Sequence, residues 1–133
     1  MNPVRATRLA RSMAWGVGAL DLGAGGAMVF EPNWAFARVG LSAPPDEGLV
    51  FVRFLGAMVA AVGAAYWFGV SARHRLRPML EMTIVFRLAA GAFAAGGLAL
   101  GWLEWPWLAV PLVDFALVAA QLIGLRNGAG RHA

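Results

Sequence analysis

The fold of this chain is decided by residues 49–70, which read LVFVRFLGAMVAAVGAAYWFGV and contain one charged residue, Arg53. A helix needs about 20 consecutive, mainly apolar residues to cross the ~30 Å hydrocarbon core of a bilayer. Three other segments meet this requirement, at about Met13–Phe30, Met79–Trp102 and Trp107–Leu125. Because lipid offers the backbone no hydrogen-bond partners, all four segments are expected to be α-helices.

The composition supports the same assignment. The chain has 133 residues, of which 60% are hydrophobic and 14% are charged, whereas a soluble domain is about half apolar and a quarter charged. We therefore predict an all-α polytopic membrane protein, a four-transmembrane-helix up-down bundle in which residues 1–133 form a single membrane domain in contact with the lipid bilayer. A cleaved signal peptide is the competing interpretation of residues 13–30, but Asp21 interrupts that apolar run.

The positions of the arginines predict the orientation. All basic residues are arginines, and four spans place most of them on one side of the membrane: Arg5, Arg8, Arg11, Arg73, Arg75, Arg77, Arg126 and Arg131. The opposite side has Arg38 alone, together with several carboxylates. Since cytoplasmic loops carry an excess of basic residues, we expect both termini in the cytoplasm, with the protein in the inner membrane of a bacterium. Nucleic-acid binding is not expected, because the arginines form no patch on a water-exposed domain.

The connections between the spans differ in length. The first, residues 31–48, contains Pro32, Pro44 and Pro45, which prevent one continuous helix, and residues 33–40 are expected to lie on the membrane interface. Residues 71–78 are expected to form a short basic link. The tight link at 103–106 predicts that the third and fourth spans pack as an antiparallel hairpin. The tail at 127–133 is expected to be disordered.

Small residues indicate where helices approach each other closely. The pair Gly97 and Gly101 forms a GxxxG pattern in the third span. Gly18 and Gly25 lie seven residues apart in the first span, and the second span has small residues at four-residue spacing at 56, 60 and 64. We expect these positions to lie in helix–helix contacts, for which packing within the protein is favoured over a homodimer.

Three ionisable residues fall near the centre of the membrane: Asp21, Arg87 and Asp114, at depths of about 13–16 Å from the predicted inner side. A charge at this depth costs at least ~2.5 kcal/mol and therefore needs a partner or water. We expect Arg87 to bridge the two aspartates, with Thr83 and Gln121 extending the polar network one and two helical turns away. Two interpretations of this cluster stay open. The charges either stabilise the packing of the helices against each other, or they form a site for a substrate, a proton or a lipid headgroup.

Two charged groups lie nearer the membrane surfaces. Arg53 is expected to extend to the outer surface or to pair with a carboxylate there. Alternatively, Arg53, Glu31 and Glu47 mark the mouth of an outward-facing pocket. Glu81 follows Arg77 by one helical turn, and this spacing predicts an exposed ion pair.

Several kinds of chemistry are disfavoured. His74 and His132, the only histidines, lie outside the predicted spans, so a membrane haem is not expected. Cysteine is absent, and no grouping of ligands has the spacing of a metal site. We expect no cofactor. An enzyme acting on lipid through Asp21 or Asp114 as acid or base is a third, less favoured hypothesis.

Short motifs suggest a family. Segment 49–125 contains several short motifs that resemble those of a known group of membrane proteins. They are RFLG at 53–56 and GAAY at 63–66 in the second span, Arg87 followed by Gly91 in the third, and Asp114-Phe115 in the fourth. The segment resembles the small bacterial four-span proteins of the DoxX-like and BphX-like families. The resemblance implies a small bundle that serves as an accessory membrane component and gives no catalytic residues.

A second resemblance is to the small multidrug-resistance transporters, in which Asp21 would take the place of the acidic residue of the first span. The residues around Asp21 do not match that family, and the first loop is too long for it. The leading prediction is therefore a non-enzymatic accessory or scaffold subunit that binds membrane-protein partners or lipid. The alternative is a homo-oligomeric transporter or proton-coupled carrier that uses Asp21, Arg87 and Asp114.

Overall fold

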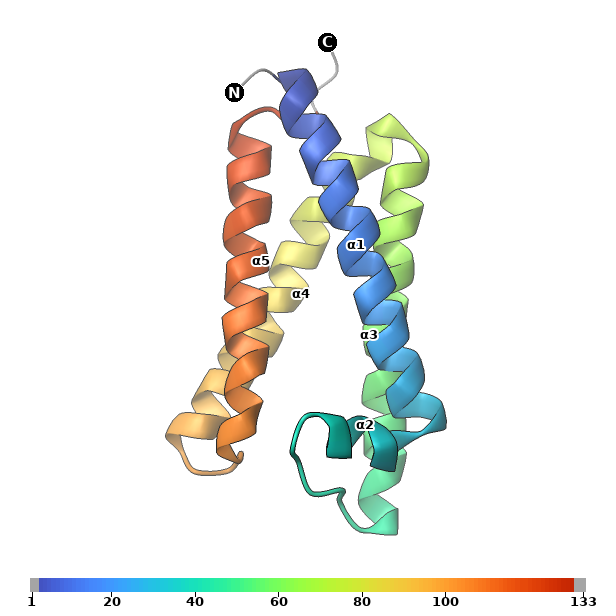
Figure 1. The fold of residues 1–133 in the computed structure, drawn as a ribbon. Coiled ribbons are helices and arrows are strands. Elements are labelled where there is room, and N and C mark those ends of the chain that lie inside the picture. The colour runs from blue at the N-terminus through green and yellow to red at the C-terminus, as the bar shows by residue number, and fades with distance from the viewer. Residues whose placement is uncertain (1–2, 131–133) are drawn as a thin grey trace. The chain divides into compact units, whose positions relative to one another are not determined.

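The structure, a computed structural model, describes residues 3–130, and its regular elements in that range are all helical. In chain order they are α1 (Pro3–Phe30), α2 (Pro32–Arg38), α3 (Asp46–Ser71), α4 (Arg73–Ala99), the 3₁₀ helix η1 (Trp105–Leu108) and α5 (Ala109–Arg126) (Figure 1). Four segments are long and apolar enough to cross a membrane: Val4–Phe30, Asp46–Ser71, His74–Ala99 and Trp105–Arg126. The predicted all-α, up-down class is confirmed, and the chain is a multi-pass membrane protein in contact with the lipid bilayer.

The helices reach further toward the predicted inner side than the apolar segments do. α1 begins at Pro3 rather than near Met13, because arginine is a good helix former and proline is well suited to the first helical position. The expected basic link at 71–78 is wrong, since only Ala72 separates α3 from α4. Pro78 lies inside α4, at the expense of one backbone hydrogen bond that proline cannot donate.

α4 ends at Ala99 and not at Trp102, because Gly101 has a positive φ of 72°. The backbone N–H of Gly101 donates to the carbonyl of Leu98 (3.1 Å), and that of Trp102 donates to the carbonyl of Gly97 (2.8 Å). This pattern is a Schellman motif, which satisfies the last carbonyls of a helix. The GxxxG interpretation of Gly97 and Gly101 is therefore wrong, since Gly101 lies past the helix end.

The same motif ends α5 and orders the segment that follows it. Gly128 has a φ of 86°, and the N–H of Ala129 donates to the carbonyl of Gly124 (2.9 Å). Ala129 is fully buried, and the N–H of Gly130 donates to Oγ1 of Thr7 (3.3 Å). The expected disorder is thus wrong for residues 127–130, because α1 and α5 supply partners that the tail alone lacks. Residues 131–133, with Arg131 and His132, lie outside the described residues.

The chain divides into two compact units, Ala14–Trp67 and the combination of Met1–Met13 with Phe68–Ala133. In the unit Ala14–Trp67, α1 and α3 run antiparallel and touch through glycine. A Cβ atom added to Gly25 would lie 2.5 Å from the backbone N of Ala60 and from the carbonyl O of Gly56. One added to Gly18 would lie 2.9 Å from the carbonyl O of Gly63.

These contacts confirm the helix faces predicted from small residues, with one change of position. Gly63 takes the place expected for Ala64, which is exposed. At the other end of this contact, the rings of Trp15 and Trp67 lie 5.2 Å apart, and the indole N–H of Trp67 donates to the carbonyl of Trp15 (3.3 Å). α1 and α3 are therefore packed with their backbones in close contact at the glycines, and the Trp15–Trp67 ring contact adds to this packing at one end.

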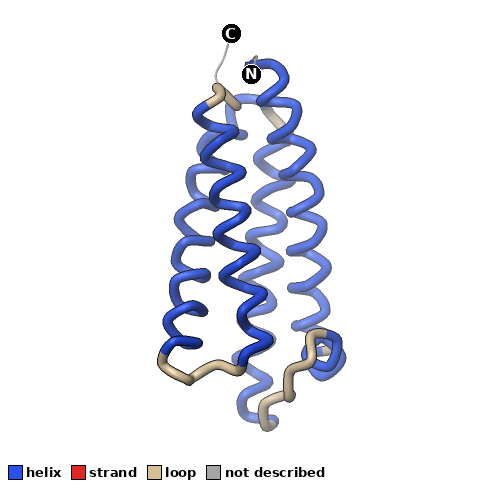
Figure 2. Tube along the Cα trace, turned by 60° about the vertical axis from the view of Figure 1, so that its left-hand side comes forward, coloured by secondary structure: helices blue, strands red, loops and turns tan. Residues whose placement is uncertain are grey.

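In the second unit, α4 and α5 form the antiparallel hairpin that the short 103–106 link predicts, and Figure 2 shows them side by side. Leu76 and Leu80 of α4 are almost completely buried, as is Ala6 of α1. The Arg11 guanidinium donates to the carbonyl of Val70 at the end of α3 (2.9 Å). This hydrogen bond joins the first turns of α1 to the end of α3 within the unit.

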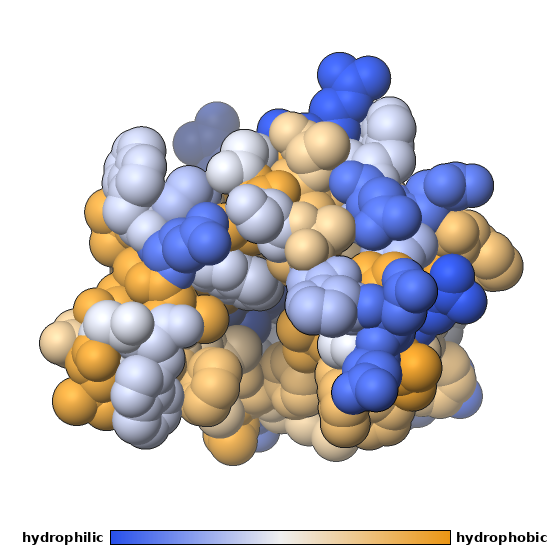
Figure 3. Space-filling model, turned by 90° about the horizontal axis from the view of Figure 1, so that it is seen from below, coloured by the Kyte–Doolittle hydropathy of each residue, from blue (hydrophilic) through white to orange (hydrophobic). Residues whose placement is uncertain are grey.

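Much of the protein surface is apolar. Phe51, Phe93 and Trp105 are 74%, 69% and 78% exposed. Seen from below, hydrophilic side chains gather in separate groups among hydrophobic ones (Figure 3). Apolar exposure on this scale is uncommon on soluble monomers, and it is what a surface that faces lipid requires.

Candidate functional site

A buried ion pair joins the middle of α4 to the middle of α5. Nη1 of Arg87 lies 2.7 Å from Oδ1 of Asp114, and the two side chains are 7% and 11% exposed. Both residues are central in their membrane spans, His74–Ala99 and Trp105–Arg126. A charge-assisted hydrogen bond of this length is a strong one, and arginine suits the position because it stays protonated.

Gly91, one helical turn after Arg87, determines how closely the two helices approach each other at the pair. A Cβ atom added there would lie 2.9 Å from the ring of Phe115 and 3.3 Å from Cβ of Asp114. The missing side chain of Gly91 therefore makes room for the ring of Phe115 and for the Cβ atom of Asp114. The sequence contained a signal for this role, a glycine four residues from the central arginine, which we noted only within the family resemblance.

Thr83 lies one helical turn from Arg87 and Gln121 lies two turns from Asp114, both nearer the inner end of the same helix pair. The Thr83 hydroxyl is 3.0 Å from the carbonyl of Met79, 3.1 Å from that of Leu80 and 3.5 Å from Oε1 of Gln121. It has one proton to donate, and the shorter distances favour a carbonyl of its own helix over the glutamine. Thr83 and Gln121 are 4% and 1% exposed.

The polar groups in the interior are satisfied. Among the residues that the structure describes, no buried side-chain nitrogen or oxygen lacks a hydrogen-bond partner. A fully bonded network of this kind fixes the positions of the helices that contribute to it. The Arg87–Asp114 pair, with Thr83 and Gln121, thus forms one polar seam between α4 and α5.

Asp21 belongs to the unit Ala14–Trp67, and Arg87 and Asp114 belong to the other. The bridge from Arg87 to Asp21 therefore stays a prediction. Tyr66, the only tyrosine of the chain, is fully buried in the unit Ala14–Trp67. Because tyrosine is uncharged, nothing in the sequence indicated that this polar side chain would be buried.

The three candidates for an outer mouth are not joined by ion pairs in the described part of the chain. Arg53, Glu31 and Glu47 are all exposed. Nearer the other end of the spans, the predicted pair of Arg77 with Glu81 is confirmed at 2.8 Å, with side chains 42% and 50% exposed. An exposed pair of this kind contributes at most about 1 kcal/mol.

Within residues 3–130, no group of three or more histidine, aspartate or glutamate side chains could hold a metal ion. What the site can do chemically follows from its two charges. An arginine and an aspartate in mid-membrane can hold two helices together, or can exchange their mutual bond for one to an anion or a proton.

The family suggested by the short motifs is not identified. The four apolar helices are consistent with a small four-span membrane protein, and RFLG at 53–56 lies on α3 as the resemblance implies. Comparison of the chain with known proteins finds no matching family model, no matching curated protein and no matching solved structure.

Proposed function

We propose that this protein is a non-enzymatic accessory subunit that binds a transmembrane helix of another membrane protein against α1. The observation that carries the proposal is an open face of small residues on that helix: Gly16, Ala19, Gly23 and Gly26. Within the unit Ala14–Trp67, no residue outside α1 lies within 4 Å of a Cβ atom added to any of these three glycines. Small residues at such spacing let a second backbone approach closely.

The spacing of this face suits a helix as the occupant. Steps of three, four and three residues keep the four positions on one side of α1, in the seven-residue repeat of left-handed helix packing. By helical periodicity, Trp15 and Leu20, which are 52% and 62% exposed, flank the small residues on the two sides of this face. The opposite face of the same helix already uses Gly18 and Gly25 in this way, against α3.

A photo-crosslinking residue at position 23, incorporated in cells of the native host, tests the proposal. We expect one adduct with a different membrane protein, and we expect Gly16→Leu to abolish it because the leucine side chain covers this face. The thermal midpoint of the purified Gly16→Leu protein should stay unchanged. The matched control is the same crosslinker at Leu112 of α5, which is 62% exposed and is not part of the small-residue face of α1. An adduct with a second copy of this chain, or equal adducts from both positions, would contradict a dedicated partner site.

The alternative function is a small homo-oligomeric transporter or proton-coupled carrier. The buried Arg87–Asp114 pair favours it, since ionisable residues inside membranes often mark substrate or proton pathways. Asp21 would then complete the site. Purified protein in liposomes should transport protons or small ions, and Asp114→Asn should abolish that flux. Flux absent from the unmodified protein, or unchanged by Asp114→Asn, contradicts this function.

The arrangement in the membrane is part of the proposal. The arginine-rich ends of α1, α4 and α5 support an assignment of both termini to the cytoplasm of a bacterial cell, with the protein in its inner membrane. Labelling of cysteines introduced at the two termini, from each side of the membrane, checks this assignment. Termini on opposite sides would exclude it.

A further inference from the structure

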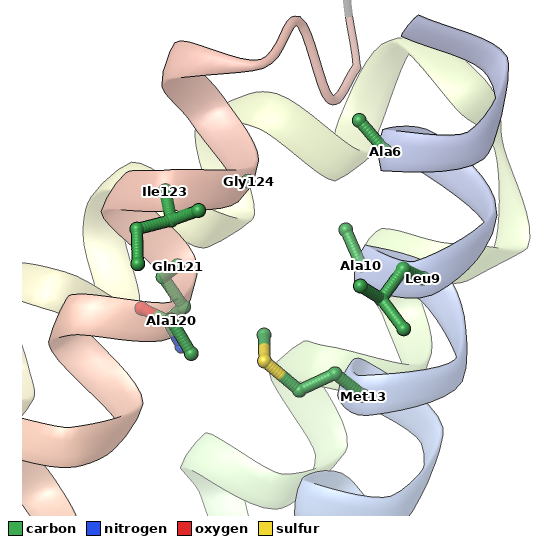
Figure 4. A pocket seen from close by; sticks show the side chains of 8 residues that line it. All are labelled: Ala6, Leu9, Ala10, Met13, Ala120, Gln121, Ile123 and Gly124. Atoms are coloured by element: carbon green, nitrogen blue, oxygen red, sulfur yellow. The ribbon is translucent and has the colours of Figure 1, made fainter. Parts of the chain in front are cut away.

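A small groove opens between the start of α1 and the end of α5. Its volume is about 80 Å³, and Figure 4 shows Leu9 and Met13 on the α1 side facing Ala120 and Ile123 on the α5 side. The groove is almost entirely apolar, and the one polar side chain on its wall, Gln121, is buried and hydrogen-bonded within the protein. Leu9 and Ile123 are 63% and 57% exposed, so the groove is open at the side.

The depth of the groove places it at the border between hydrocarbon and headgroups. The first span, Val4–Phe30, is longer than the roughly 20 residues that cross the hydrocarbon, so its first turns reach into the headgroup layer. Leu9 lies in that part of α1, and Ile123 lies in the last turn of α5, which ends at Arg126. An apolar groove at this depth is suited to bind the part of an acyl chain that lies nearest the lipid headgroup.

Two arginines lie one helical turn beyond the groove-lining residues Leu9 and Ile123, toward the ends of α1 and α5. Arg5 precedes Leu9 by four residues, and Arg126 follows Ile123 by three, so each lies over its apolar neighbour and one turn nearer the helix end. Both are exposed, and neither forms a hydrogen bond or an ion pair with any described residue. Arg11 and Arg77, in contrast, already have partners in the protein.

We propose that this groove binds an anionic membrane phospholipid. One acyl chain lies against Leu9, Met13 and Ile123, and the phosphate accepts hydrogen bonds from Arg5 and Arg126. A negative headgroup on a hydrocarbon chain is complementary to an apolar groove with two nearby guanidinium groups that have no partner among the described residues. The proposal does not depend on a protein partner at the small-residue face of α1.

Native mass spectrometry of the full chain in mild detergent tests the proposal with phosphatidylglycerol and phosphatidylcholine of the same acyl chains. We expect the protein to retain phosphatidylglycerol with a preference on the order of tenfold. The double variant Arg5→Gln/Arg126→Gln should lose this preference. The matched control is Arg8→Gln, which removes an equally exposed arginine from the side of α1 that faces away from the groove.

A third variant, Ala120→Phe, keeps both arginines and fills the groove, and it should also lose the bound lipid. The proposal is overturned if the double variant keeps the preference, or if Arg8→Gln reduces it as much, because the attraction would then be a general one to positive charge. It is equally overturned if Ala120→Phe retains the lipid, since the headgroup would then bind without the groove. Circular dichroism of each variant confirms that the helices remain formed.

Discussion

Replacing Arg87 with leucine is expected to lower the free energy of unfolding of the detergent-solubilised protein by about 3–5 kcal/mol. The substitution leaves Asp114, whose side chain is only 11% exposed, as a buried charge without its 2.7 Å partner. A buried carboxylate that loses its cation must be desolvated without compensation or must take up a proton. The measurement is an unfolding titration with a denaturing detergent, followed by helical circular dichroism.

The reverse substitution and the double variant make this prediction specific to the pair. Asp114→Leu should be destabilising in the same way, because it leaves a buried guanidinium. The double variant Arg87→Leu/Asp114→Leu should be more stable than either single variant, since it removes both charges together. The matched control is Arg53→Leu, which removes an exposed arginine from α3 and should change the stability little. An unchanged thermal midpoint for a monodisperse Arg87→Leu protein would refute a structural role of the pair.

This comparison also separates the two interpretations of the polar seam. If the charges serve only to fasten α4 to α5, leucines at both positions can replace them, and cells that need the protein should accept the double variant. If the charges serve transport, the double variant should be stable and inactive. The stability measurement and the functional measurement therefore answer different questions about the same two residues.

Gly25→Leu is expected to give the second large effect, a loss of about 3 kcal/mol or more, at the upper end of the range for overpacking. The new Cβ atom would lie 2.5 Å from backbone atoms of Ala60 and Gly56, and a backbone cannot move aside as a flexible side chain can. α1 and α3 would have to separate along their contact. We expect a lower thermal midpoint and weaker protection of the α3 amides in hydrogen exchange.

The neighbouring residue provides the control. Gly26→Leu makes the same chemical change one residue further along α1, where nothing lies within 4 Å of the added Cβ atom. Its effect on the stability of the isolated protein should be small, or slightly favourable, because glycine is a poor helix former. Equal destabilisation by both substitutions would show that the close approach of Gly25 to α3 is not what holds this unit together.

The sequence predicted some glycine roles well and others poorly, and the difference has a physical cause. Gly18, Gly25 and Gly56 lie inside long apolar segments, so a helical face could be assigned to each of them from spacing alone. Gly101 lies near the end of such a segment, where a glycine can equally well terminate a helix. Apolar periodicity continues through Leu100 and Trp102 and does not reveal the positive φ that ends α4.

From the sequence alone it was possible to predict the number of membrane helices, their up-and-down order and the central positions of Arg87 and Asp114 in their spans. These properties follow from the length and polarity of each segment, because lipid accepts only helices and tolerates few charges. Three features became visible only in the folded chain: the pairing of these two charges at 2.7 Å, the room that Gly91 leaves beside Asp114, and the hydrogen bond from Gly130, beyond the end of α5, to Thr7 of α1. Such contacts depend on how helices are rotated and spaced against each other, and no single segment contains that information.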